Sequence, residues 1–199
     1  MSGVAALLCL LAPVDLDRLL KLVEDRYNRA RTIQVQFQQS FTQQGRTRTE
    51  SGELFLRKPG KMRWEYHTPA GKLFLSDGKN VYFYSPSANR VERSKLKESE
   101  DYRAPLAFLL GKLNFKKDFR EIRKEGEKIV AMPSTDRLPY RQVEFEATPD
   151  GELRRVTITG QDASVMRFEF TNERRNVPLN DTFFTFRAPF GAEIVEAAN

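Results

Sequence analysis

The spacing of hydrophobic residues changes near residue 32, and this change limits what the chain can fold into more than any other feature. Before it, apolar residues recur every three or four positions behind a suitable N-cap, Asp15, and this set comprises Leu16, Leu19, Leu20, Val23 and Tyr27. After it, Ile33, Val35 and Phe37 alternate with glutamines. The first pattern predicts an amphipathic helix of about four turns, and the second predicts a strand with one apolar face.

Short segments rich in strand-forming residues follow at close intervals, with turn residues between them. In the first half of the chain they are residues 53–57, 62–67, 72–75 and 81–84, and in the second half 119–123, 128–132, 141–147, 153–159, 165–170 and 182–187. The 15 phenylalanines suit strands better than a helical bundle. The sequence therefore predicts a mainly β fold, with about ten or eleven strands in one large antiparallel sheet.

The two halves differ in how many faces of the sheet are apolar. Strands of the second half alternate, as in Val143 and Phe145 between glutamate and glutamine residues, and so need one apolar neighbour. In the first half, Leu54, Phe55 and Leu56 place apolar side chains on both faces. Apolar side chains on both faces need two covers. In an incompletely closed barrel, one of these faces would form a concave apolar trough that something must occupy. We expect its lining to be Phe37, Leu54, Leu56, Met62, Trp64, Tyr66 and Phe74, although the core of an ordinary sandwich is a competing interpretation.

A short apolar segment between the two strand sets is a candidate cover for this trough. Pro105 suits a first helical turn, Gly111 suits a stop, and the residues between them include Leu106, Phe108, Leu109 and Leu110. A helix this short would not persist alone in water. We expect it to act as a lid together with the N-terminal helix, through Leu16 and Leu20, although a fixed core helix explains the pattern equally well.

The N-terminus has the pattern of a targeting signal. Residues 4–11 form a compact apolar run, followed by Ala12 and Pro13, which is too short to span a bilayer. Residues 1–3 lack the usual basic residue, so the true start of this signal is left open. We expect residues 1–13 to be a signal peptide and residues 14–199 to be one domain. Removal of the only cysteine, Cys9, would leave no thiol for a disulfide or a thiolate metal site.

Charge and chemistry exclude several classes of function. The net charge is +6, but the basic residues are scattered and interleaved with acidic ones, which is typical of a solvated surface rather than a nucleic-acid site. His67 is the only histidine, and neither a catalytic triad nor a cluster with metal-ligand spacing can be recognised. We therefore expect no enzyme activity, no catalytic residue, no metal, no cofactor and no nucleic-acid partner.

An ordered set of segments resembles the LolA family of periplasmic outer-membrane lipoprotein carriers. The segments are residues 52–59, 62–66, 76–84, 105–110 and 184–191. No single segment is specific, but together they cover most of the mature chain in the right order. The resemblance implies an incompletely closed antiparallel barrel, whose cavity holds the acyl chains of lipoproteins beneath a movable helical lid.

The resemblance also implies partners and a place. It predicts a monomer in the periplasm of a Gram-negative bacterium, which receives acylated lipoproteins from an inner-membrane ABC-type releasing complex and delivers them to an outer-membrane receptor. The family commonly has arginine where this chain has Lys58, and that arginine ties the lid to the barrel, so we expect Lys58 or neighbouring Arg57 to act as the latch. Met62 stands where the family often has phenylalanine. A carrier or sensor of another lipid, or a structural adaptor sandwich, remains an alternative.

Overall fold

The computed structural model describes residues 15–96 and 113–196, which form one curved sheet and two helices. Helix α1 (Leu16–Arg29) begins directly after Asp15, where the sequence predicted it. Its buried residues are those of the predicted apolar stripe: Leu19, Leu20, Val23 and Tyr27. The second helix, α2 (Phe115–Asp118), is a single turn in which the side chain of Asn114 accepts a hydrogen bond from the backbone of Lys117.

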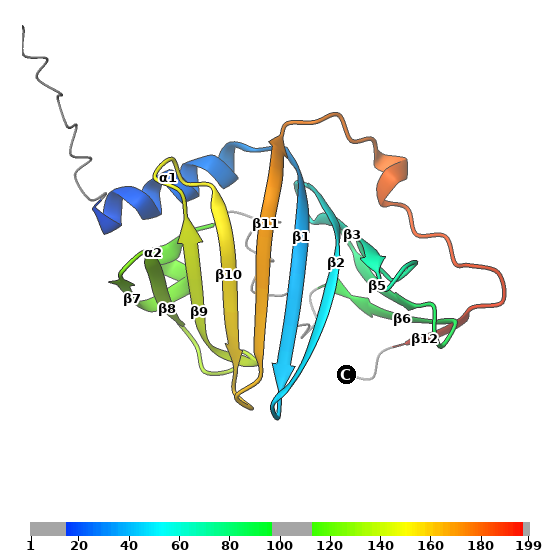
Figure 1. The fold of residues 1–199 in the computed structure, drawn as a ribbon. Helices are drawn as coiled ribbons and strands as arrows, with labels where there is room; N and C mark the ends of the chain where they lie inside the picture. The colour runs from blue at the N-terminus through cyan, green and yellow to red at the C-terminus, as the bar shows by residue number, and fades with distance from the viewer. Residues whose placement is uncertain (1–14, 97–112, 197–199) are drawn as a thin grey trace, which may run out of the picture.

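All the described strands belong to a single sheet of twelve (Figure 1). In sheet order they are β12 (Glu193–Glu196), β6 (Arg90–Lys95), β5 (Asn80–Ser85), β4 (Leu73–Asp77), β3 (Lys61–Thr68), β2 (Arg46–Arg57), β1 (Thr32–Gln43), β11 (Val165–Arg175), β10 (Leu153–Gly160), β9 (Tyr140–Ala147), β8 (Lys128–Pro133) and β7 (Phe119–Glu125). Neighbours run antiparallel except β12, which pairs with β6 in parallel. In the described part of the chain β7 and β12 are edges, so the sheet does not close.

The sheet curls around an apolar interior. Strands β3 and β11 are separated by β2 and β1, a distance of about 14 Å in a flat sheet. The rings of Trp64 on β3 and Phe168 on β11 nevertheless lie with their centroids 5.4 Å apart. Buried residues of α1, β1 to β5 and β8 to β11 therefore form one cluster on the concave, inner face. This confirms the predicted incompletely closed antiparallel barrel, with twelve strands instead of ten or eleven.

The prediction of a strand at residues 182–187 is wrong. Residues Asp181–Phe184 form a 3-10 turn, η3, and the segment from residue 177 to β12 runs along the outer face of β2 to β6 (Figure 1). The Phe183 ring packs edge-on against Phe55 at 4.8 Å, and Phe186 stacks on Tyr82 at 4.5 Å. The second apolar face of the first-half strands is thus covered by the C-terminal segment. The aromatic side chains of this segment find apolar partners on that face, which they would lack in a strand at the edge of the sheet.

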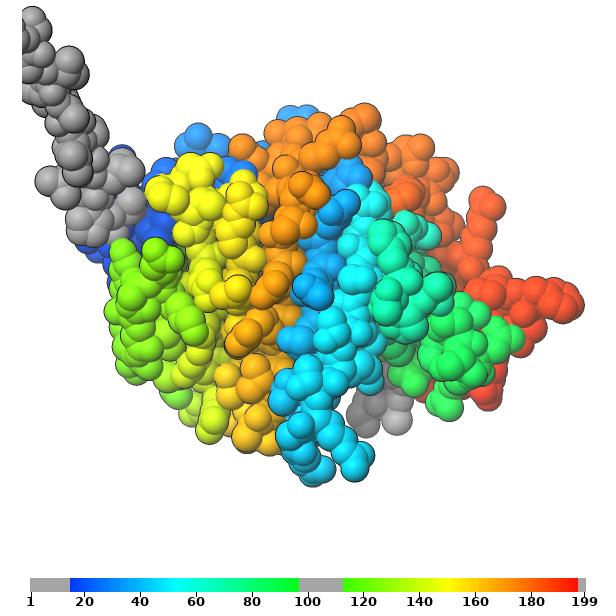
Figure 2. Space-filling view, in the orientation of Figure 1, coloured from blue at the N-terminus to red at the C-terminus, as the bar shows by residue number. Residues whose placement is uncertain are grey.

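Where the C-terminal segment does not cover it, most of the outer face is open to solvent. Figure 2 shows β9, β10, β11, β1 and β2 as one continuous surface, with the β1–β2 hairpin projecting at its lower end. Polar pairs cross this surface, such as Arg155 with Glu146 at 2.8 Å. The apolar interior therefore lies on the inner face, and the second-half strands have the single apolar neighbour that their alternation predicted.

Two predictions fall on residues that the structure does not describe. The signal peptide at residues 1–13, which includes Cys9, and the lid residues Leu106, Phe108, Leu109 and Leu110 all lie outside the described ranges. Within those ranges, no helix is long and apolar enough to cross a membrane.

Candidate functional site

The predicted cavity residues all lie on the inner face of the sheet. Each of the seven is at most 5% exposed and belongs to the same buried cluster: Phe37, Leu54, Leu56, Met62, Trp64, Tyr66 and Phe74. They meet because β1 to β4 are sheet neighbours and their inward positions are in register, as in the pairs of Leu54 with Trp64 and of Trp64 with Phe74. The structure thus assembles one apolar wall from residues that are spread over nearly 40 positions of sequence.

Trp64 and Met62 make a polar contact inside this wall. The Trp64 indole is fully buried, and its N–H donates to the Met62 sulfur at 2.7 Å. A buried indole N–H needs an acceptor, and a thioether is a weak one. The methionine therefore supplies an acceptor that a phenylalanine in its place would lack.

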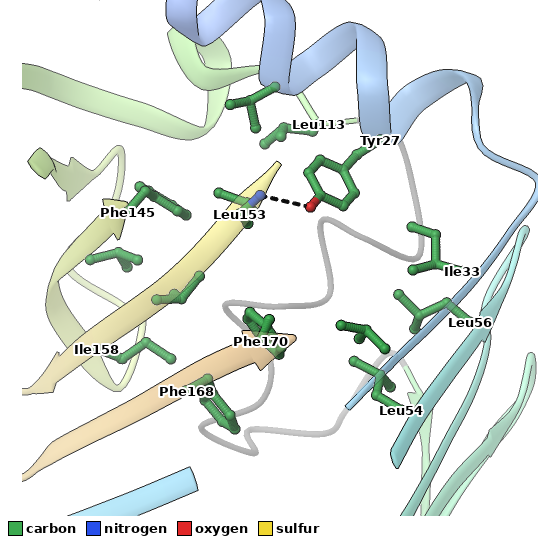
Figure 3. Packing of buried hydrophobic residues seen from close by; sticks show 14 of the residues in the cluster. Tyr27, Ile33, Leu54, Leu56, Leu113, Phe145, Leu153, Ile158, Phe168 and Phe170 are labelled. Atoms are coloured by element: carbon green, nitrogen blue, oxygen red, sulfur yellow. Dashed lines mark hydrogen bonds between the residues drawn. The ribbon is translucent and has the colours of Figure 1, made fainter. Parts of the chain in front are cut away.

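A narrow apolar cavity lies between two walls beneath the end of α1. Figure 3 shows Leu153 and Phe170 on one side, Ile33, Leu54 and Leu56 on the other, and Tyr27 close to both. The cavity volume is about 10 Å³, which is space for about one water molecule. Pockets that hold organic ligands usually measure about 300–1,000 Å³. Between the described residues this cavity is therefore too small for an organic ligand, which would have to separate the walls.

Ionic contacts hold the end of α1 to one of these walls. The Arg26 guanidinium contacts Glu173 of β11 at 2.8 Å, Glu152 at 2.9 Å and Asp150 at 3.0 Å. The Tyr27 hydroxyl donates to Glu173 at 2.5 Å and accepts from the backbone N–H of Leu153 at 2.9 Å. Burial, followed by the charge of Glu173, raises the pKa of Tyr27 well above its ordinary value. The helix end is thus fixed to β10 and β11.

Gly151 brings the helix close to the β9–β10 turn. Its φ of +85° lies in the left-handed region, and a Cβ here would lie 2.7 Å from the carbonyl carbon of Leu22 in α1. Only glycine permits both this conformation and this approach. The turn therefore fits directly against the helix backbone beside the Arg26 contacts.

Lys58 ties the same helix end to the opposite wall. Its ammonium donates to the carbonyl oxygen of Tyr27 at 2.7 Å, and carbonyls in the last helical turn have no partner within the helix. Burial lowers the pKa of Lys58. Arg57 points to the outer face instead, where it donates to the Leu179 carbonyl at 2.9 Å and lies 3.4 Å from Asp181. Of the two residues expected to act as a latch, Lys58 is thus the one that contacts α1 among the described residues, and the latch role stays a prediction.

Helix α1 also holds the chain that follows residue 112. The side-chain amide of Asn28 donates to the carbonyl of Leu113 and accepts from its N–H, both at 2.8 Å. The backbone N–H of Phe115 donates to Glu24 at 2.8 Å. Of the predicted lid residues that are described, Leu20 is buried in the cluster and Leu16 packs against it. The anchoring roles of Asn28, Glu24 and Arg26 were missed, because they look like residues of the solvated side of the helix.

This arrangement can be compared with known proteins. A sequence profile described as "Outer membrane lipoprotein carrier protein LolA" matches residues 28–187. The chain belongs to the LolA family. An outer-membrane lipoprotein carrier protein of Nitrosospira multiformis is 30% identical over 172 residues, which is 83% of each chain. The protein of that name from Chromobacterium violaceum is 27% identical over 170 residues, which is 83% of this chain and 82% of the relative.

The fold of this chain also resembles that of solved structures. The crystal structure of an uncharacterized conserved protein from Thermus thermophilus superposes with a TM-score of 0.54, covering 91% of this chain and 98% of that one at 14% identity. At this identity the likeness concerns architecture alone. That protein therefore shares the curled open sheet, and the likeness says nothing of its function or of this chain's.

Proposed function

We propose that this LolA family member carries lipoproteins by binding their acyl chains between α1 and the inner face of the sheet. Its place is the periplasm of a Gram-negative bacterium, where residues 14–199 work as one domain after the signal peptide is removed. The carrier performs no chemistry on its cargo. It receives acylated lipoproteins from an inner-membrane ABC-type releasing complex and passes them to an outer-membrane receptor.

The observation that carries this proposal is the closed apolar cavity beneath Tyr27. Apart from Glu173, its walls are aliphatic and aromatic, and they belong to two different parts of the sheet, β1 with β2 and β10 with β11. A methylene group withdrawn from water contributes about 0.8 kcal/mol, so one long acyl chain contributes on the order of 10 kcal/mol. Separating the walls exposes apolar surface and offsets part of this gain. The net affinity is then low enough for a partner with a better apolar surface to remove the cargo.

Unequal anchoring of α1 supports a definite opening movement. Arg26 and Tyr27 bind the helix end to β10 and β11 through several contacts. On the side of β2, the contact found among the described residues is the hydrogen bond from Lys58 to the Tyr27 carbonyl. We propose that the bond from Lys58 to the Tyr27 carbonyl breaks when the cavity opens, with α1 staying on β10 and β11. Leu106, Phe108, Leu109 and Leu110 would complete the lid.

Binding of a synthetic lipopeptide tests the carrier function. The purified protein is titrated with a dipalmitoyl-glyceryl lipopeptide and with the same peptide lacking acyl chains, and complexes are detected by native mass spectrometry and calorimetry. We expect a one-to-one complex with the first and none with the second. If the lipopeptide failed while another lipid bound, the chain would carry or sense that lipid, and if nothing apolar bound, it would be an adaptor.

A pair of lysine variants tests the latch. Lys58→Met removes the donor to α1 but keeps an apolar stem of similar length, and we expect the lipopeptide to bind several-fold faster because one hydrogen bond no longer holds the cavity closed. Lys61→Met is the control, because Lys61 pairs with Asp181 on the outer face. Equal association rates for the two variants would refute the role of Lys58.

A further inference from the structure

Four exposed arginines lie where α1 and β11 end, at the top of the molecule in Figure 1. Residues 25–31 and 173–176 together contain five arginines and two carboxylates. Arg26 is engaged in its contacts with acidic side chains at β10 and β11. The other four are exposed to solvent, and we name them the arginine rim: Arg29, Arg31, Arg174 and Arg175.

Hydrogen bonds hold the two segments of the rim side by side. The Asn176 side chain accepts from the backbone N–H of Arg31 at 3.0 Å, and the Asn176 N–H donates to the Thr32 carbonyl at 2.8 Å. Successive residues of a strand point to opposite faces, so Arg174 and Arg175 stand on the two sides of the sheet end. The fold thus gathers arginines that are scattered in the sequence onto one supported edge.

Acidic side chains neutralise little of this charge. Within residues 15–96 and 113–196, no carboxylate forms an ion pair with Arg31 or Arg174. Arg29 and Arg175 each have an acidic neighbour, at 3.7 Å and 3.6 Å. Each of these two carboxylates makes a shorter contact with another cation, at 2.9 Å and 2.8 Å. The rim therefore keeps a surplus of positive charge.

The rim has no apolar centre on which a protein partner could be anchored. The large apolar side chains that are exposed in the described part of the chain are Phe190 and Ile194, near β12. Protein interfaces depend on aromatic and aliphatic anchors that become buried. A membrane surface, in contrast, attracts basic side chains by charge, and a guanidinium matches phosphate oxygens with two parallel hydrogen bonds. The rim therefore fits an anionic phospholipid surface better than a protein.

The rim also borders the apolar cavity beneath α1. Ile33 and Glu173 line that cavity, and they lie two residues from Arg31 and next to Arg174. A membrane that contacts the rim would therefore lie beside the end of α1, where the walls of the cavity meet.

We propose that the arginine rim docks the protein on an anionic phospholipid surface, with the end of α1 and the cavity turned toward the lipid. Docking in this orientation shortens the path that an acyl chain takes through water between the membrane and the cavity. The inference rests on the proposed carrier function for its purpose, and adds the surface at which the cargo changes hands.

Binding to lipid vesicles tests the inference. Co-sedimentation compares vesicles of phosphatidylcholine alone with vesicles that contain about 30% phosphatidylglycerol, the anionic lipid. We expect the unaltered protein to bind the anionic vesicles, and to be released by about 0.5 M salt, which screens the charges. Each basic residue near such a surface strengthens binding about fivefold, so Arg31→Gln/Arg174→Gln should bind about 25-fold more weakly.

The control variant removes the same charge at the opposite end of the strands. Arg46 begins β2 at the β1–β2 hairpin, Arg137 lies between β8 and β9, and both are exposed. Arg46→Gln/Arg137→Gln should bind the anionic vesicles within about twofold of the unaltered protein, because its changes lie beyond the range of screened charges. Urea unfolding should give the same midpoint for both variants, since all four side chains are exposed.

Two outcomes would overturn the docking. Equal losses in the two variants would show attraction by net charge alone, and binding that ignores phosphatidylglycerol would leave the rim to an acidic protein or to solvent. Lipopeptide binding is measured separately, without vesicles, and we expect it to be unchanged in both variants. Its absence from the unaltered protein would refute the carrier function, whereas the vesicle results decide the docking.

Discussion

Replacing Arg26 by methionine tests whether its ionic contacts fix α1 to the sheet. The Arg26 side chain is 12% exposed and Glu173 is 4% exposed, so the substitution leaves a buried carboxylate without its main cation. Breaking such a pair typically costs about 3–5 kcal/mol. Tyr27 still donates to Glu173, and Asp150 is largely in solvent, so we expect the lower end, about 3 kcal/mol. For a chain of this size, this corresponds to a fall in Tm of about 6–12 °C.

Urea unfolding followed by circular dichroism measures this loss. Arg154→Met is the matched control, because Arg154 also contacts Glu152, at 3.0 Å, but is 50% exposed. An exposed pair contributes about 1 kcal/mol or less, so the control should keep nearly the full free energy of unfolding. If Arg26→Met lowered the stability no more than Arg154→Met, the network would not anchor the helix, and the proposed opening movement would lose its fixed side.

Three further predictions concern stability. Gly151→Ala should lower the free energy of unfolding by roughly 2 kcal/mol more than Gly126→Ala. Both glycines have positive φ, but only at Gly151 would a Cβ meet the α1 backbone. Equal urea midpoints for the two variants would contradict the close approach. The pKa of Tyr27 is raised in the folded protein, so its contribution is complete below pH 10 and is lost as the pH rises above 10. Thermal unfolding from pH 8 to 11 should thus show a shallower alkaline loss for Tyr27→Phe, and parallel curves would disprove this. Met62→Leu should cost about 1–3 kcal/mol and shift the fluorescence of Trp64, since the indole N–H loses its acceptor; an unchanged spectrum and midpoint would show that the sulfur contact is unimportant.

Alternation of apolar and polar residues was sufficient to predict most of the sheet. Ten of the predicted segments lie in strands, because each presents enough apolar side chains to the interior to be recognised locally. Strand β6 was missed, since Val91 is its one apolar residue among arginine, glutamate, serine and lysine. Strand β12 was missed because four residues in parallel pairing with β6 leave little local pattern. Both strands form through pairing with a neighbour that the sequence does not reveal.

The first-half strands do have two buried apolar faces, as the sequence predicted, but the sequence did not indicate what covers the outer one. Phe55 and Leu75 do face away from the inner cluster and are buried. Their cover is the C-terminal segment, whose Phe184 is 1% exposed. Local alternation could not distinguish this packed segment from a strand, because its conformation depends on contacts with residues more than a hundred positions earlier.

The candidate site likewise has a part that the sequence could predict and a part that it could not. Its apolar wall could be predicted, because hydrophobic residues at inward positions of neighbouring strands must meet. The contact of Lys58 with a backbone carbonyl of α1 could not, since nothing in a sequence marks which carbonyl is unpaired. The pairing of Arg26 with Glu173 depends equally on the fold, which brings together two residues from opposite ends of the chain.

The order of strands has a consequence for synthesis. Strand β1 pairs with β11, where Ile33 lies opposite Arg175, and β6 pairs with β12. While the ribosome is still making the middle of the chain, β1 has only one of its two neighbours. Such distant pairings close late, because a long loop must be ordered first. The sheet is therefore complete only after its last strands have been translated.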